Sequence, residues 1–279
     1  MTTLAERVAS ARSLLFVPGD RPDRFEKAVA SGADLVVLDL EDAVAPGHKD
    51  VARAAVAEFL AAAATPAVVR INGTDTAWCA DDLAAVGGHG CAVMVPKAHS
   101  AAQLAEVSAT LGPAVPLIAL VETAAGIHAC ASVCGVEAVA RAAFGSIDLA
   151  AELGVDPDAA DALQYARSAL VLGSAAAGRP APLDGVTTDI RGDTALISDV
   201  ALAVRLGFGG KLCIHPSQVS AVNEGFSPSA AEVQWARRVL TAASDGQVCV
   251  VDGRMVDKPV VDRARRIASR SSSAVMEWS

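Results

Sequence analysis

Over most of its length the sequence alternates between short aliphatic runs and alanine-rich segments of helical period. The aliphatic runs are rich in Val, Ile and Leu with little polar alternation, which is typical of strands covered by helices on both faces. They predict eight strands, at Ser13–Val17, Asp34–Asp39, Ala67–Ile71, Ala92–Pro96, Leu117–Glu122, Arg141–Phe144, Pro182–Gly185 and Lys211–Ile214. The segments between them predict helices such as those at Arg24–Ser31, Lys49–Ala63, Ala101–Thr110, Thr123–Ser132, Pro157–Gly173 and Asp193–Arg205, and a short helix near Gln218–Val222 follows the last strand. Eight successive β-then-α units indicate the α/β class and a closed (β/α)8 barrel of the TIM type.

The barrel is expected to occupy residues 12–224, and an appendage follows at 225–270. We predict that this appendage contains a helix (Pro228–Ala243), an extended stretch (Gln247–Val256) and a basic helix (Val260–Arg270), with a frayed tail after them. Because a barrel does not need these elements to close, we expect them to act as a lid or to contact a neighbouring subunit.

The composition excludes several classes of protein. Of the 279 residues 52% are hydrophobic and only 4% are aromatic, which supplies an aliphatic core and excludes extensive disorder. A net charge of −9 argues against nucleic acid or an anionic membrane as partner. The sequence shows neither a secretory signal nor a membrane span. The six cysteines are irregularly spaced and are expected to be buried thiols, because a zinc pair at Cys130 and Cys134 would lack partners nearby. Free thiols indicate a reducing compartment, so we expect a cytoplasmic protein.

Charged residues gather where the predicted strands end. In a parallel barrel, catalytic groups come from these carboxyl ends and from the loops that follow them. The positions concerned are Asp20 and Arg21, Asp39, Glu41 and Asp42, Arg70, Lys97, Glu122, Asp148 and His215. The opposite strand ends begin with small or apolar residues, so the asymmetry predicts an active site at one mouth of the barrel.

Two carboxylates, Glu122 and Asp148, end neighbouring strands. Such a pair is costly unless a proton or a cation lies between them, and two carboxylates with open positions suit Mg²⁺. The alternative is that each caps a helix, since Thr123 and Leu149 open helical segments.

Arg70 ends the third strand, where a buried guanidinium needs an anionic partner. Glu41 or Asp42 could supply it, either as a structural ion pair or as the support of an arginine that binds substrate. Arg21 and Lys27 follow the first strand and favour a phosphate group, although Lys27 could instead pair with Asp23.

Eight ordered motifs carry a resemblance to a known family. They are RSLLFVPGDRPDRFEKA, VVLDLEDAVAPGHKDVAR, VVRINGTDT, MVPKA, ALVETAAGI, FGSIDLAAELG, GFGGKLCIHPSQV and DGRMVDKPVV, and they span residues 12–268. The chain resembles the HpcH/HpaI aldolase/citrate lyase family, and within it the citrate lyase beta-subunit-like branch of CoA ester lyases. That family is a Mg²⁺-containing barrel, commonly a trimer or hexamer, which cleaves a C–C bond in 3-hydroxy-acyl thioesters.

The resemblance implies roles for individual residues. Glu122 and Asp148 match the metal ligands, and Arg70 matches the substrate-binding arginine that would stabilise an enolate. Asp257 matches an aspartate that the C-terminal segment places in a neighbouring subunit as acid or base, although it could equally be a turn residue. Glu41 and Asp42 are expected to orient Arg70 or metal-bound water. Contacts to the thioester are expected from Phe16, Arg21, Lys27, Ile147, Ile214 and His215.

The predicted activity is therefore Mg²⁺-dependent cleavage of a citramalyl-CoA or malyl-CoA type ester to acetyl-CoA or propionyl-CoA and a 2-oxo acid, in a homotrimer or hexamer. Four alternatives stay open at this point: a citrate lyase beta subunit that uses a carrier-protein thioester, a malyl-CoA thioesterase, a pyruvate-type aldolase without CoA, and a non-catalytic protein that binds CoA esters.

Overall fold

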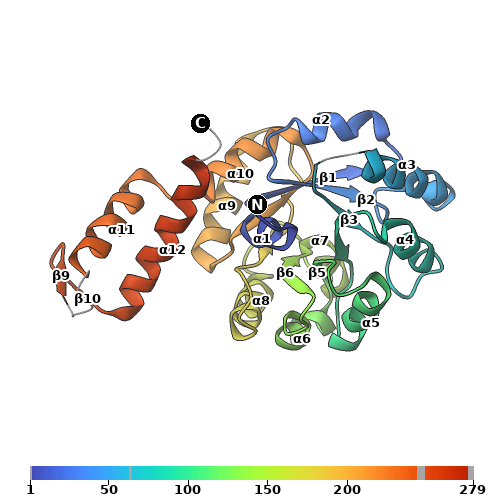
Figure 1. Ribbon diagram of the computed structural model, residues 1–279. Helices are drawn as coiled ribbons and strands as arrows, with labels where there is room; N and C mark the ends of the chain where they lie inside the picture. Colours follow the sequence, from blue (N-terminus) through green and yellow to red (C-terminus); the bar gives the residue numbers. More distant parts are fainter. Residues whose placement is uncertain (1, 63–64, 244–248, 276–279) are drawn as a thin grey trace. The chain divides into compact units, whose positions relative to one another are not determined.

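The computed structural model describes residues 2–62, 65–243 and 249–275. The chain divides into two compact units, residues 1–224 and 225–279, which are described separately below. Figure 1 shows the elements of both units.

The first unit is a closed barrel of eight parallel strands in sequence order, with the last strand paired to the first. Its strands are β1 (Ser13–Pro18), β2 (Leu35–Asp39), β3 (Ala67–Arg70), β4 (Ala92–Val95), β5 (Leu117–Val121), β6 (Val139–Phe144), β7 (Leu183–Asp184) and β8 (Gly210–Cys213). The predicted fold is thereby confirmed, and each predicted strand overlaps the observed one. The predicted strand end at Glu122 is wrong by one position, because β5 stops at Val121 and leaves the Glu122 carboxylate beyond the ladder.

Helices surround the strands (Figure 1). They are α1 (Leu4–Ser10), α2 (Phe25–Val29), α3 (Lys49–Ala62), α4 (Cys79–Val86), α5 (Ala101–Leu111), α6 (Ala124–Cys134), α7 (Ser146–Leu153), α8 (Gln164–Ala176), α9 (Asp193–Leu206) and α10 (Val219–Gly225). Short 3₁₀ turns lie at Pro22–Arg24, Pro46–His48 and Pro216–Gln218. The predicted helix end at Ala63 lies outside the described residues.

The prediction of a helix from Pro157 is wrong, because α8 begins only at Gln164. Before it, the Asp156 side chain accepts the N–H of Asp158 and the Asp161 side chain accepts that of Ala162. Such local side-chain bonds give the backbone an alternative to a helix. Helices α1 and α4 were not predicted, and α7 begins at Ser146, before the expected Leu149.

The barrel interior is filled by aliphatic side chains that the strands direct inward. The buried set includes Leu14, Val37, Val68, Met94, Ile118, Leu120, Ala143, Leu183 and Leu212. Helix α1 closes one end, where Val8 and Ala11 join this core and their carbonyls accept the buried Arg141 guanidinium. Because this end of the barrel is filled, a pocket is expected at the opposite end, where the strands finish.

The second unit is a helical hairpin with a small sheet. It comprises α11 (Ala230–Ala242), the antiparallel pair β9 (Cys249–Val251) and β10 (Arg254–Val256), and α12 (Lys258–Val275). A core of Ala236, Val239, Val256 and Ala264 holds it together. The predicted helices and extended stretch are present in the described part, although α12 continues past Arg270, and Gln247 and Val248 lie outside that part.

Two further expectations concern membranes and thiols. Among the described residues, no helix has both the length and the apolar character needed to cross a bilayer. The five cysteines whose side chains are described are buried free thiols, at 79, 91, 130, 134 and 213. The Cys249 side chain lies outside the described part.

Candidate active site

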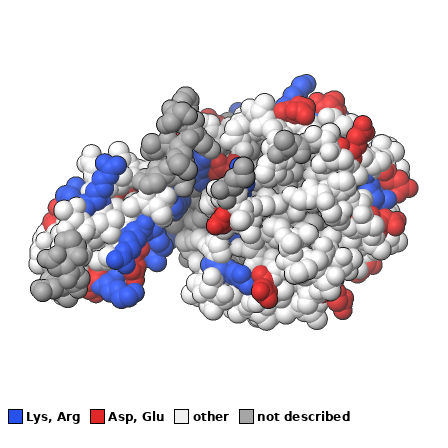
Figure 2. All heavy atoms as spheres, viewed as in Figure 1, with Lys and Arg blue, Asp and Glu red and all other residues white. Residues whose placement is uncertain are grey.

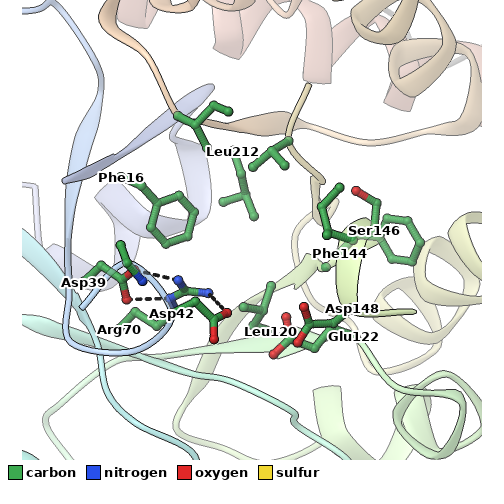
Figure 3. Close-up of a pocket in the computed structure, with 15 residues that line it drawn as sticks. Phe16, Asp39, Asp42, Arg70, Leu120, Glu122, Phe144, Ser146, Asp148 and Leu212 are labelled. Carbon is green, nitrogen blue, oxygen red and sulfur yellow. Dashed lines mark hydrogen bonds and ion pairs between the residues drawn. The ribbon is translucent and has the colours of Figure 1, made fainter. Parts of the chain in front are cut away.

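A pocket of about 360 Å³ lies at the barrel mouth. It is lined by residues at the ends of several strands, among them Phe16, Asp39, Asp42, Arg70, Leu120, Glu122, Ser146, Ile147, Asp148 and Ile214. Figure 3 shows the carboxylates of Glu122 and Asp148 close together on one side and the Arg70 guanidinium on the other. Most sequence-predicted site residues of the barrel therefore meet at one cavity.

Arg70 is held by carboxylates that follow the neighbouring strand. Its Nε and Nη2 donate to the two oxygens of Asp39 at 2.7 and 2.6 Å, and Nη1 lies 3.1 Å from Glu41 and 3.4 Å from Asp42. Burial alone lowers the Arg70 pKa, but the bonds and charges of these acids together outweigh it, so the pKa is raised. Arg70 therefore stays charged, with its guanidinium plane fixed toward the pocket.

Asp39 is the principal partner of Arg70, a role that the sequence analysis gave to Glu41 or Asp42. The residue stands directly opposite Arg70 in the register of β2 and β3 and is almost fully buried. It also accepts the backbone N–H groups of Glu41 and Ala43. The register of the two strands, which places Asp39 opposite Arg70, was the signal that could have identified Asp39 as the partner.

Glu122 is a buried acid whose environment favours its protonated form. Burial, together with the nearby carboxylates of Glu41 and Asp148, raises its pKa to about 8. Its Oε1 accepts the backbone N–H of Lys97 at 2.8 Å. Helix capping is not its role, because Thr123 caps α6 with its own hydroxyl. A proton or a cation beside Glu122 would therefore offset the cost of burying its carboxylate next to two other acids.

Asp148 lies in the first turn of α7 and is about one-third exposed to the pocket. Gly145 permits the close approach of this turn to Glu122, because a Cβ at Gly145 would lie 2.3 Å from the Glu122 Cβ and 2.4 Å from its Oε2. The glycine of the FGSID motif therefore allows the carboxylates of Glu122 and Asp148 to lie close together.

Lys97 is a site residue to which the sequence analysis gave no role. Its Nζ lies 2.9 Å from Glu41 Oε1 and 3.6 Å from Asp148 Oδ2. Burial lowers its pKa, yet the contact with Glu41 and the neighbouring acids reverse this and raise it. The ammonium thus links the Glu41–Arg70 side of the site to the Asp148 side.

Only some of the residues expected to contact a thioester line the pocket. Phe16 lines the pocket and stacks beneath the Arg70 guanidinium at 4.8 Å, and Ile147 and Ile214 line the pocket as well. Arg21 forms an exposed ion pair with Asp23, so the alternative pairing of Asp23 with Lys27 is not the one observed. His215 is exposed, and its ring accepts the N–H of Ser217 at the start of a 3₁₀ turn.

Asp257 belongs to the second unit. It stands between β10 and α12, where its carboxylate lies 3.4 Å from the Val260 N–H and its carbonyl accepts the Val261 N–H. Asp257 thus has a turn role at the start of α12. Its assignment as an acid or base in the active site of a neighbouring subunit stays a prediction.

Comparison with known proteins identifies the family. The model of the HpcH/HpaI aldolase/citrate lyase family matches residues 12–216. The chain belongs to this family. A citrate lyase subunit beta-like protein of Mycobacterium tuberculosis is 39% identical, with 96% of this chain and 98% of that protein covered. A (3S)-malyl-CoA thioesterase of Cereibacter sphaeroides is 34% identical, with 97% and 98% covered.

Solved structures agree with this assignment and confirm the predicted branch. The structure of the M. tuberculosis protein CitE in complex with magnesium, acetoacetate and coenzyme A matches with a TM-score of 0.81 and 38% identity, covering 95% of this chain and 99% of that one. A family member with this fold therefore holds a divalent cation together with a CoA molecule.

The donor set at the barrel mouth fits Mg²⁺. Within the described residues, no group of three or more His, Cys, Asp or Glu side chains is arranged to hold a metal ion by itself. Mg²⁺ is commonly bound by one or two carboxylates, and water and substrate oxygens complete its shell. Glu122 and Asp148 provide such a pair, and a cation would offset the burial and the repulsion that raise the Glu122 pKa.

Proposed function

We propose that this protein is a Mg²⁺-dependent carbon–carbon lyase that acts on a 3-hydroxy-acyl-CoA of the citramalyl-CoA or malyl-CoA type. The products would be acetyl-CoA or propionyl-CoA and a 2-oxo acid. The observation that carries the proposal is that two carboxylates, which follow β5 and β6, face an arginine paired with Asp39 across one pocket. Family membership and the CoA-bound relative support it.

The carboxylates of Glu122 and Asp148 would hold the ion, which when bound lowers the pKa of the substrate's 3-hydroxyl group. The hydroxyl proton would pass to solvent water, and the C=O bond of the 2-oxo acid would form as the adjacent C–C bond breaks. The electron pair of the broken bond would pass into the thioester to give an enolate. Arg70, aligned by Asp39, Glu41 and Asp42, would stabilise the developing enolate oxygen.

Protonation of the enolate carbon completes the cleavage. We assign this step to Asp257 of a neighbouring subunit in a homotrimer or hexamer, with residues 225–270 acting as the lid. The thioester arm would pass Phe16, Ile147 and Ile214 at the pocket wall, and Arg21, Lys27 and His215 would contact its outer part.

Product analysis by mass spectrometry tests the proposal directly. The panel comprises stereoisomers of citramalyl-CoA, malyl-CoA, methylmalyl-CoA and hydroxymethylglutaryl-CoA, each with Mg²⁺, with chelator, and with Glu122→Gln. We expect one ester to yield a shorter acyl-CoA and a 2-oxo acid, and we expect chelation and Glu122→Gln each to abolish this. Intact esters throughout would reject a CoA lyase and favour a carrier-protein thioester or a binding role.

A thioesterase is the second candidate, because relatives of similar identity bear the name (3S)-malyl-CoA thioesterase. The same assay separates the two reactions. Hydrolysis releases free CoA and the intact hydroxy acid, whereas C–C cleavage leaves the thioester bond in the acyl-CoA product.

A further inference from the structure

Lys97 contacts three carboxylates at the barrel mouth, each through a different geometry. Its backbone N–H donates to Glu122, and its ammonium lies between Glu41 and Asp148. Asp148 is consequently shared: one neighbour is the Glu122 carboxylate and another is the Lys97 ammonium. With the proposed cation bound between Glu122 and Asp148, the Asp148 carboxylate would lie between that cation and the Lys97 ammonium, two adjacent positive positions such as a pair of closely spaced metal ions would occupy.

The backbone at Lys97 has an unusual conformation, which sets the direction in which the side chain leaves the chain. Its φ of 49° lies in the left-handed region, which costs a residue with a Cβ roughly 1–2 kcal/mol. The conformation is held on both sides, because the next residue, Ala98, donates to the Leu120 carbonyl and Gln103 Nε2 lies 3.4 Å from the Lys97 carbonyl. Retained strain of this kind is typical of functional sites.

The charge balance gives the ammonium a purpose. Five carboxylates lie along this network (Asp39, Glu41, Asp42, Glu122 and Asp148). Among the described residues, Arg70, Lys97 and Lys49 oppose them, since the Lys49 ammonium donates to the Glu41 carbonyl and interacts with Asp39, Glu41 and Asp42. With every acid ionised, one divalent ion then leaves a residual formal charge of zero. Without Lys97 the same ion would leave −1, with two acids, Glu41 and Asp148, facing the vacated position.

We propose that the Lys97 ammonium occupies the place of a second divalent cation and thereby limits the carboxylate site to one ion. This inference rests on the proposed function, since it assumes that Glu122 and Asp148 bind a cation. Lys97 is a positioning residue in this account: it specifies the number of ions through Glu41 and Asp148 and does not itself react.

Titration with Mn²⁺, followed by electron paramagnetic resonance, tests the inference without a substrate. We expect one bound Mn²⁺ per chain in the wild type and two in Lys97→Ala, with the magnetic coupling of a closely spaced pair. Lys97→Asn is a second neutral variant, because Asn tolerates the left-handed backbone. Lys97→Arg retains the charge and should bind a single ion. Arg191→Ala removes one charge from an exposed loop and should also bind one.

The outcomes separate this inference from the proposed function. A single uncoupled Mn²⁺ in both Lys97→Ala and Lys97→Asn, with thermal melts showing folded proteins, would overturn the role of Lys97 and leave the proposed function standing. If the wild type binds no Mn²⁺, or if Glu122→Gln does not weaken its binding, the proposed cation site fails and the inference fails with it.

Discussion

Glu122 couples cation binding to pH at the scale of a single residue. Because burial and two neighbouring acids raise its pKa to about 8, the carboxyl group is protonated at neutral pH until a cation displaces the proton. We therefore expect the affinity for Mg²⁺ or Mn²⁺ to rise by up to roughly tenfold per pH unit below this pKa and to level off above it. Calorimetry in buffers of different ionisation enthalpy measures the released proton. An affinity that does not vary between about pH 6 and 9 would contradict the assignment.

The same raised pKa makes a prediction for stability. The folded state holds the Glu122 proton more tightly than the unfolded chain, so this stabilisation is fully present below about pH 4.5 and is lost as the pH rises through about 8. The raised pKa of Glu41 acts in the same direction. In chelator, the melting temperature should fall from pH 6 to 9 by several degrees, and Mg²⁺ should restore it. Glu122→Gln should flatten the pH dependence and abolish the Mg²⁺ effect.

Asp39 and Asp42 provide a matched pair, because both face Arg70 but differ in burial. Asp39→Asn leaves the buried guanidinium without its bidentate anion, so we expect a loss of about 3 kcal/mol in the free energy of unfolding and roughly a hundredfold fall in kcat/KM. Asp42 is exposed and 3.4 Å away, and Asp42→Asn should cost less than about 1 kcal/mol. Urea unfolding and steady-state kinetics measure both. Equal effects of the two substitutions would argue against the central place of Asp39.

The strands were easier to predict than the helices, for a physical reason. A strand buried on both faces must be continuously apolar, so runs such as those at β2 and β5 are visible in the sequence. Short helices such as α4 depend on tertiary packing more than on periodicity, and α4 was missed. At the site, the strand-end rule located Arg70 and Glu122, whereas the role of Lys97 depends on side-chain reach across the mouth, which no pattern along the chain records.

Substitution of Gly145 tests whether the junction of β6 and α7 positions the Glu122 carboxylate. A Cβ at this position would overlap the Glu122 side chain, so Gly145→Ala should displace that carboxylate while leaving the barrel folded. We expect Mn²⁺ affinity to fall at least about tenfold and activity to fall with it. Gly47→Ala is the control, because a Cβ there meets no atom within 4 Å. Wild-type Mn²⁺ affinity in Gly145→Ala would show that Glu122 is not confined by this glycine.

At the scale of the whole molecule, charge differs sharply between the two units. Residues 1–224 carry 26 acidic and 15 basic side chains, whereas residues 225–279 carry six acidic and eight basic ones. Figure 2 shows Lys and Arg side chains along the face of the second unit that it displays. Opposite net charges on the two units would attract each other, which is consistent with the contact between copies that we propose for the lid.

Mixing two inactive variants tests whether one active site draws on two subunits. Glu122→Gln removes a barrel ligand and Asp257→Asn removes the proposed acid of the lid, so each homo-oligomer should be nearly inactive. In mixed oligomers with random composition, about a quarter of the sites would combine an intact barrel with an intact neighbouring lid, and activity should recover to that extent. The measurement is kcat after co-refolding or co-expression, with oligomer mass determined by light scattering. If Asp257 served its own barrel, no mixture could contain an intact site, and activity would stay at the level of the separate variants.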